Sequence, residues 1–296
     1  MDRLLVSVVI PVFNAEKYLR QAISSALDQT LPPHEIIIVD DGSTDSSREI
    51  ASSFGPAVIC LSQQHQGPSA ARNLATARSS GDWIAFLDAD DYWLPDKLAR
   101  QAAVIEADPN VELVYTGRTE LLPDGTTRDV PAMPVPWVRR MLAFEDPIFP
   151  TTVMARRSLL MEHPWPDSFK SSEDWWLFYR LSRITTFAAI EEPTAIYRLH
   201  LESLNNREWK LMLHYAEMVA QDIQTDFTGY HKLLLCRRVN SRLFASAALS
   251  ARKQGSPEFL RYIVKSLVSW PFPDFRPARY KICLMMLIQK IEGWRA

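Results

Sequence analysis

Apolar, β-branched runs that end abruptly in polar residues dominate the first ninety residues of the chain. Residues 4–10, 36–39 and 83–87 are runs of this kind, and segments with the apolar spacing of helices lie between them, at 15–29 and 68–77. A strand that is apolar on both faces is typical of a sheet covered on both sides. The alternation therefore predicts an α/β fold, with a mostly parallel sheet flanked by helices. A further strand, at 57–61, contains Cys60, which we expect in the core.

The residues that follow these strands are the first candidates for a site. They are Phe13-Asn14, Asp40-Asp41 and Asp88-Ala89-Asp90-Asp91. Open α/β sheets bind ligands at the carboxyl ends of their strands. We therefore expect the three groups to share one edge of the sheet.

The acidic cluster at 88–91 places three carboxylates within four residues. Like charges at this spacing repel each other unless a cation binds there. A hard cation such as Mg²⁺ or Mn²⁺ uses one or two carboxylates and completes its shell with phosphate oxygens and water. The alternative is a helix start capped by Asp90 or Asp91. The pattern does not match a calcium-binding EF-hand loop.

Three other polar groups each have a functional and a structural interpretation. Asp40-Asp41 could accept hydrogen bonds from a base or a ribose, or could form a turn and a helix cap. Arg72 could contact a phosphate or a base, or could pair with a neighbouring Asp. Glu173-Asp174 could act in catalysis, or could stabilise the dipole at a helix start capped by Ser171 or Ser172.

Taken together, these groups resemble the motifs of the family 2 glycosyltransferases, which have the GT-A fold. The resemblance covers about residues 4–204 and rests on five segments in order. They are Val8 to Asn14, Ile38 to Ser43, Ala71-Arg72-Asn73, Phe86 to Asp91, and Glu173-Asp174 with Trp175-Trp176. Tyr197-Arg198-Leu199-His200, followed by Ser203, resembles a sequence often found beyond the last motif.

The resemblance implies roles for particular residues. The nucleotide-sugar donor would be bound by Pro11, Phe13, Asp40, Asp41, Arg72, Asp88 and Asp90. Within this set Asp88 would contact the ribose, and Asp90 would ligate a Mn²⁺ or Mg²⁺ ion that bridges the two phosphates. His200 would add a metal or phosphate contact. Asp174 would be the general base.

The implied function is an inverting, metal-dependent transfer of a sugar from a nucleotide-diphosphate sugar to a hydroxyl group. A UDP-sugar is the favoured donor, and the acceptor would be a glycan or a lipid-linked molecule in polysaccharide biosynthesis. Two alternatives remain. A sugar nucleotidyltransferase would need a Gly-rich phosphate loop near the first strand, and residues 11–20 contain no Gly. A non-catalytic nucleotide- or sugar-binding module is the second, although the chain keeps all the acids that catalysis needs.

The distribution of charge divides the chain. Residues 1–204 carry 18 basic and 28 acidic side chains, a net charge of −10, whereas residues 205–296 carry 15 and 7, a net charge of +8. We expect a GT-A catalytic domain at 1–204, with its nucleotide-binding half at about 1–92 and its acceptor half at about 93–204. Residues 205–296 are expected to form a helical C-terminal region.

The basic C-terminal region suits an anionic partner. Residues 279–294 mix apolar and basic side chains, so peripheral membrane contact through these helices is one interpretation, and docking on the catalytic domain or in a homodimer is another. No signal peptide or membrane-spanning stretch is visible, and the three cysteines are odd in number and widely separated. We therefore expect a cytoplasmic protein, with contact to the inner face of the membrane left open, and no nucleic-acid partner.

Overall fold

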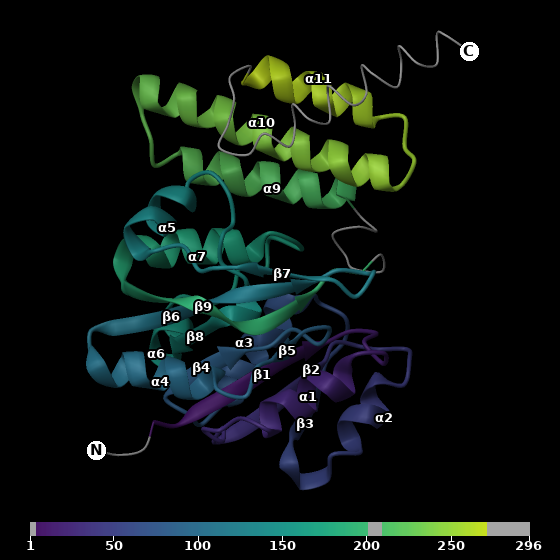
Figure 1. Ribbon diagram of the computed structural model, residues 1–296, viewed down its shortest axis with the longest axis vertical. Coiled ribbons are helices and arrows are strands. Elements are labelled where there is room, and N and C mark those ends of the chain that lie inside the picture. The colour runs from purple at the N-terminus through teal and green to yellow at the C-terminus, as the bar shows by residue number, and fades with distance from the viewer. Residues whose placement is uncertain (1–3, 201–208, 271–296) are drawn as a thin grey trace. The chain divides into compact units, whose positions relative to one another are not determined.

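The computed structural model describes residues 4–200 and 209–270 of the chain. These residues form two compact units, one made of residues 4–142 and 146–200 and the other of residues 143–145 and 209–270. All nine strands found in the described residues belong to one sheet in the first unit (Figure 1). They are β1 (Val6–Val12), β2 (Glu35–Asp40), β3 (Ile59–Ser62), β4 (Trp83–Phe86), β5 (Tyr92–Trp93), β6 (Val111–Leu121), β7 (Thr127–Val130), β8 (Val153–Arg156) and β9 (Thr186–Arg198).

The order of strands across the sheet is β3-β2-β1-β4-β8-β6-β9-β5, and β7 pairs with β6. The first four strands in this order are mutually parallel. β8 lies antiparallel between β4 and β6, so β6 and its parallel neighbour β9 run in the same direction as the first four. This confirms the α/β fold with a mostly parallel sheet that the sequence predicts.

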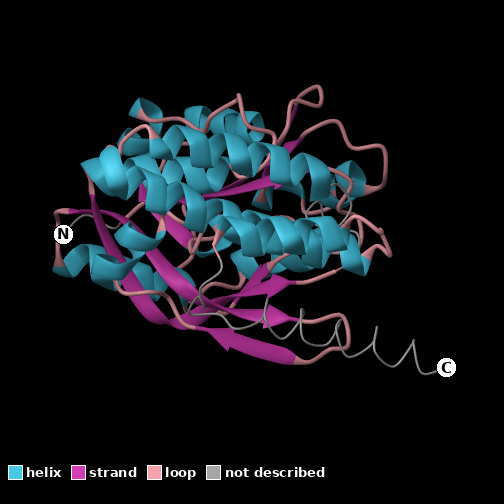
Figure 2. Ribbon diagram, turned by 90° about the horizontal axis from the view of Figure 1, so that it is seen from above, coloured by secondary structure: helices cyan, strands magenta, loops and turns pink. Residues whose placement is uncertain are grey.

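Helices flank this sheet, as Figure 2 shows. The helices of the first unit are α1 (Leu19–Leu27), α2 (Ser47–Ser52), α3 (Pro68–Arg78), α4 (Lys97–Ala107), α5 (Val135–Met141), α6 (Arg157–Glu162) and α7 (Glu173–Ile184), with short 3₁₀ turns η1 (Gly55–Ala57) and η2 (Pro150–Thr152). Alternate residues of β1, from Val6 to Val12, share one buried cluster with residues of α1 and α4. Helix α3 packs against β1 and β2. Burial on both sides explains why these strands read as continuous apolar runs.

Two strands of the sheet, β6 and β9, are long and irregular. β6 runs for 11 residues and β9 for 13. These two strands pair with each other in parallel and contain register shifts. The short strand β8 and the helix α6 were not predicted, because a four-residue strand that follows a Pro-rich segment has little periodicity to detect.

The prediction for Cys60 was wrong, because its side chain is exposed. The strand that carries it, β3, is the first in the sheet order and therefore an edge strand. Ile59, the preceding residue of the same strand, is exposed too, at 44% of its surface. An apolar run at the edge of a sheet is covered less completely than the same run at the centre.

The second unit is helical. Its helices are α9 (Trp209–Gln224), α10 (Gly229–Lys253) and α11 (Phe259–Ser269), and α10 packs against both of the others (Figure 1). Trp209, Ala247 and Ala251 are buried together in this unit. The segment at 279–294, which the sequence marks as amphipathic, lies outside the described residues. Within 4–200 and 209–270, no helix has both the length and the apolar character needed to cross a bilayer.

Candidate active site

Phe13 and Asp41 lie at the carboxyl ends of β1 and β2, which are paired neighbours in the sheet. The Phe13 side chain is 43% exposed, and its ring stacks on that of His65, with 4.1 Å between the ring centroids. His65 also lies 2.9 Å from Asp41, measured from Nδ1 to Oδ2. The structure thus brings two predicted donor-binding residues together, and places His65, from the loop before α3, against both of them. Pro11 precedes them on β1 and is half-buried.

The carboxylate of Asp41 fastens the loop before α3. Its Oδ1 accepts hydrogen bonds from Gln63 Nε2 at 2.7 Å and from the Gln66 amide at 2.8 Å. Its Oδ2 accepts one from the Gly67 amide at 2.8 Å. Gly67 has a φ of +97°, a left-handed value that glycine adopts without strain. This buried carboxylate therefore ties the loop before α3 to the carboxyl end of β2.

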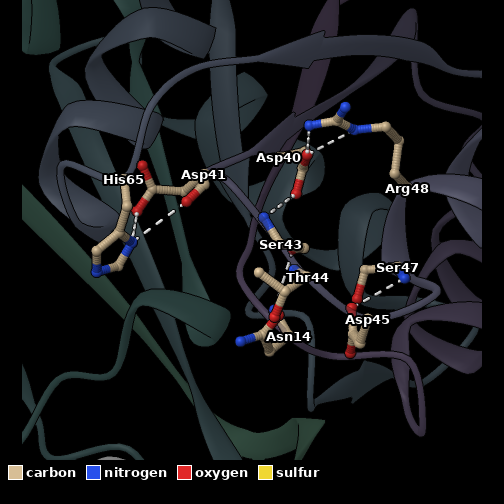
Figure 3. A network of polar contacts seen from close by, with 9 residues as sticks. All are labelled: Asn14, Asp40, Asp41, Ser43, Thr44, Asp45, Ser47, Arg48 and His65. Carbon is tan, nitrogen blue, oxygen red and sulfur yellow. Dashed lines mark hydrogen bonds and ion pairs between the residues drawn. The ribbon is translucent and has the colours of Figure 1, made fainter.

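Asp40 fastens the turn between β2 and α2 (Figure 3). One carboxylate oxygen accepts a hydrogen bond from the Ser43 amide at 3.0 Å, and the other accepts two from Arg48, at 2.9 and 2.7 Å. Burial alone would raise the pKa of Asp40, but the hydrogen bonds from Ser43 and Arg48 outweigh it and lower the pKa. In this arrangement Asp40 supports the site through the turn that it holds.

The same turn is tied to the end of β1. Asn14, which has a φ of 50°, accepts a hydrogen bond from the Thr44 amide at 2.8 Å through its side-chain oxygen. The Asn14 amide in turn donates to Ser43 Oγ at 3.0 Å (Figure 3). Ser43 and Thr44 thus connect this turn to the end of β1, and α2 itself begins after Ser46 without a side-chain cap.

The acidic cluster follows β4 directly. Burial raises the pKa of Asp88, and repulsion from Asp90 adds to the increase, although the nearby Arg72 opposes it. Burial, followed by repulsion from Asp90 and Asp88, raises the pKa of Asp91 well above its usual range. Asp91 accepts a hydrogen bond from the backbone amide of Arg198 at 2.9 Å. This bond fastens the end of β9 to the acidic cluster.

Because β9 ends beside the cluster, His200 reaches Asp90 across 110 positions of sequence. His200 Nε2 lies 3.0 Å from Asp90 Oδ2, and the two side chains are 16% and 38% exposed. The structure therefore brings together the two residues for which the resemblance implied metal contacts. Among the residues described, no group of three or more His, Cys, Asp and Glu side chains is arranged to hold a metal ion. A carboxylate and an imidazole fit an ion that takes its remaining ligands from donor phosphates and water.

Arg72, on α3, connects this cluster to α7. Its Nη2 lies 2.8 Å from Asp88 Oδ1, and its Nη1 lies 2.8 Å from Glu173 Oε1. The guanidinium also stacks over the ring of Trp165, 4.4 Å from the ring centroid. Burial would lower the pKa of Arg72, but attraction to Asp88 and Glu173 outweighs this effect and raises it. Of the two interpretations of Arg72, the structure shows the ion pair.

Asp174 stands in the first turn of α7, next to Glu173. The helix is entered through Ser172, which has a left-handed φ of 60° and makes no side-chain cap. Asp174 Oδ1 accepts a hydrogen bond from the Trp175 amide at 2.9 Å. Burial, with repulsion from Glu173, raises the pKa of Asp174 to about 7. The two adjacent acids thus differ in their surroundings. Glu173 forms an ion pair with Arg72, whereas burial raises the pKa of Asp174 to near neutrality.

Comparison with known proteins identifies this arrangement. Residues 7–154 match the model of the family described as glycosyl transferase family 2. The chain belongs to that family. It is 33% identical over 218 residues to TuaG of Bacillus subtilis, which is named for teichuronic acid biosynthesis, with 70% of this chain and 83% of TuaG covered. It is also 29% identical to WfgD of Escherichia coli, with 79% of this chain and 92% of WfgD covered.

Solved structures support the same conclusion for the fold of this family 2 glycosyltransferase. Staphylococcus aureus TarS 1–349 in complex with UDP-GlcNAc matches with a TM-score of 0.63 at 20% identity, covering 90% of this chain and 81% of TarS. The Pyrobaculum calidifontis mannosyltransferase PcManGT, in complex with GDP-Man and Mn²⁺, matches with a TM-score of 0.59 at 16% identity, covering 98% and 81%. The fold is therefore of the GT-A type, and the protein is a glycosyltransferase that uses a nucleotide-sugar donor.

Proposed function

We propose that this enzyme inverts the configuration of the sugar that it transfers, with Asp174 as the general base. The observation that carries the proposal is the place of Asp174, in the first turn of a helix that is tied to the acidic cluster through Glu173, Arg72 and Asp88. Burial at this place raises the pKa of Asp174 to about 7. A base works best when its pKa lies near the working pH, because it is then ionised and still basic enough to take a proton.

The reaction needs one displacement. The acceptor hydroxyl attacks the anomeric carbon, Asp174 takes the hydroxyl proton, and the bond from the anomeric carbon to the diphosphate oxygen breaks with its electron pair on that oxygen. A single base without a covalent nucleophile inverts the anomeric centre, by the same logic that holds for inverting glycosidases. The anomeric configuration of the product, read by NMR against that of the donor, tests this part.

The chain would hold a divalent ion, Mn²⁺ or Mg²⁺, through Asp90 with His200 beside it. When bound, such an ion neutralises the charge of a departing nucleoside diphosphate. The residues at the ends of β1 and β2, Pro11, Phe13 and Asp41, would hold the nucleobase, and Asp88 would contact the ribose. Asp40 and Arg72 would support these contacts through the turn and the ion pair in which they take part.

The experiment that tests the base is the Asp174→Asn variant. We expect it to lose sugar transfer while keeping its affinity for a nucleoside diphosphate in Mn²⁺, because the amide cannot accept the proton but leaves the donor contacts in place. Asp124→Asn, in an exposed turn, is the matched control and should transfer sugar normally. Wild-type transfer by Asp174→Asn would show that another group is the base.

A UDP-sugar is the donor that we propose, and a lipid-linked glycan of a cell-surface polysaccharide is the acceptor. WfgD is named as a UDP-glucose-dependent enzyme that acts on a GlcNAc-diphosphoundecaprenol, and TarS was solved with UDP-GlcNAc, whereas PcManGT was solved with GDP-Man. Thermal shift with UDP-, GDP-, dTDP- and CDP-sugars, each with and without Mn²⁺, distinguishes these donors.

We also propose that residues 1–204 are the catalytic domain, with its nucleotide-binding half at about 1–92, and that residues 205–296 bring a cytoplasmic enzyme to the membrane surface. Three exposed apolar residues of α11 support this, because their spacing of four places them on one helical face: Leu260, Val264 and Val268. Arg261 and Lys265 lie on the same helix and suit anionic headgroups.

A further inference from the structure

Four polar side chains project from one face of the sheet where β6 is flanked by β7 and β9 (Figure 1). Glu120 of β6 is the register partner of Arg128 on β7 and of Tyr197 on β9. Side chains of directly paired residues lie on the same face of a sheet, and so do residues two positions apart on one strand. Arg118 therefore shares this face with the other three.

The carboxylate of Glu120 is divided between the two arginines. Its Oε1 lies 2.9 Å from Arg118 Nη2, and its Oε2 accepts a hydrogen bond from Arg128 Nη2. Asp129, which follows Arg128, lies on the opposite face, where it accepts a hydrogen bond from the Thr119 hydroxyl at 2.6 Å. Within the described part of the chain, no other Asp or Glu carboxylate lies within 4.0 Å of either guanidinium. Two cations on this face are thus paired with one anion.

Aromatic rings fix the guanidinium of Arg118. Its central carbon lies 3.8 Å from the ring centroid of Phe149 and 6.0 Å from that of Tyr197, and the two rings contact each other at 4.8 Å between centroids. Stacking of this kind fixes the plane of a guanidinium, and with it the directions in which its N–H groups point. The Arg118 side chain is 15% exposed and that of Arg128 is 69% exposed, so a fixed cation lies beside one that solutes can reach.

Tyr197 connects these arginines to the acidic cluster after β4. The next residue of β9, Arg198, donates its amide to Asp91 at 2.9 Å and its Nε to the backbone oxygen of Asp90 at 3.0 Å. Burial, followed by repulsion from the carboxylates of this cluster, raises the pKa of the Tyr197 phenol. The arginines thus lie on the β6 side of the cluster, whereas the residues proposed for the nucleobase follow β1 and β2 on its other side.

We propose that Arg118 and Arg128 bind the diphosphate group of the acceptor. A guanidinium matches the geometry of phosphate oxygens with a fork of several N–H donors, and Glu120 occupies only part of each fork. An acceptor that is bound here through its diphosphate presents the sugar that it carries to the acidic cluster. The phosphates of the donor would lie at Asp90, so the two anionic substrates have separate cations. This inference rests on the proposed lipid-linked acceptor and names the group by which the enzyme recognises it.

Isothermal titration with geranyl diphosphate tests the site. The titration is run in EDTA, so that no metal ion can hold the diphosphate at Asp90. The wild type should bind geranyl diphosphate but not geraniol, which has the same chain without phosphates, and saturating UDP should not compete. We expect Arg128→Met to weaken binding about tenfold, because a charge-assisted contact to phosphate is lost. Arg128→Lys keeps the charge without the fork and should bind with intermediate affinity.

Two further variants complete the comparison. Arg100→Met removes a partly exposed arginine of α4 that is paired with a single carboxylate, and should bind geranyl diphosphate as the wild type does. Arg118→Met should weaken binding in the same direction as Arg128→Met. The result does not depend on the folding of Arg118→Met, because Arg128 is an exposed residue whose replacement leaves the aromatic contacts of this face in place.

Failure of this inference differs from failure of the proposed function. If the wild type does not bind geranyl diphosphate, or if Arg128→Met binds it equally well, the arginines are not a diphosphate site, even where Asp174→Asn abolishes transfer. Displacement by UDP would place the ligand in the donor site, and equal weakening by Arg100→Met would reflect net charge alone, so either result would also overturn the inference. If Asp174→Asn transfers sugar normally while Arg128→Met loses geranyl diphosphate, the proposed base is wrong and the diphosphate site stands.

Discussion

Arg72 Nη1 lies 2.8 Å from Glu173 Oε1, and the two side chains are only 5% and 8% exposed. The same guanidinium pairs with Asp88, so one cation compensates two acids on different elements. Removing one member of a buried pair leaves an uncompensated charge, which costs about 3–5 kcal/mol. We therefore expect Arg72→Met to lower the free energy of unfolding by about this amount, measured by urea denaturation.

Two further variants show whether the charges are the cause. Adding Glu173→Gln to Arg72→Met should restore part of the lost stability, because it removes one of the stranded acids. Arg100→Met breaks the exposed pair of Arg100 with Asp96, whose side chains are 44% and 42% exposed, and should change stability by about 0.5 kcal/mol or less. Equal losses from Arg72→Met and Arg100→Met would contradict the interpretation.

The rate of transfer should depend on pH through the Asp174 carboxyl group. Its pKa of about 7 means that the base is protonated and inactive at lower pH. We expect kcat to rise about tenfold per pH unit below pH 7 and to level off above it, as for a single ionisation. The measurement is kcat at saturating donor and acceptor between about pH 5 and pH 9, which includes both the rise and the plateau. A flat profile down to pH 5 would mean that ionisation of Asp174 does not limit the step.

Metal-supported binding should depend on Asp90 and His200, which lie 3.0 Å apart. We expect Asp90→Ala to weaken UDP binding in Mn²⁺ at least about tenfold, since an ion between phosphates and protein loses its charged ligand. His200→Ala should weaken it in the same direction. Isothermal titration of UDP, once with Mn²⁺ and once with EDTA, separates a lost metal ligand from a damaged nucleobase site. Without metal, the variants and the wild type should bind UDP with equal affinity. Undiminished affinity of Asp90→Ala in Mn²⁺ would exclude Asp90 as a ligand.

The sequence predicts the fold of about the first ninety residues well, for a physical reason. Strands such as β1 and β2 are buried on both faces, so their apolar runs and the polar residues after them are visible without any knowledge of contacts. The acids at positions 88–91 can be identified as a candidate site because a cluster of charges at the end of a buried strand costs free energy without a partner. The sequence therefore places the residues that follow such apolar runs at the ends of the strands.

Other parts of the site depend on contacts between distant segments, and local patterns do not report them. His65 stacks on Phe13 from a loop that Asp41 holds in place, and no local pattern of the sequence predicts this contact. Even the identified Arg72 could not be assigned between a phosphate and an ion pair, because the choice depends on where Glu173 lies.

The exposed face of α11 provides the sharpest test of membrane contact. Val264 is 58% exposed, in line with Leu260 and Val268 along the helix. A charge placed there opposes insertion into the interface and repels anionic lipid. We therefore expect Val264→Glu to reduce sedimentation of the enzyme with phosphatidylglycerol vesicles, while Ile184→Glu, at a residue of α7 that is also 58% exposed, leaves it unchanged. Wild-type binding should weaken with salt and with phosphatidylcholine in place of the anionic lipid. Equal sedimentation of Val264→Glu and the wild type would rule out this face as the contact.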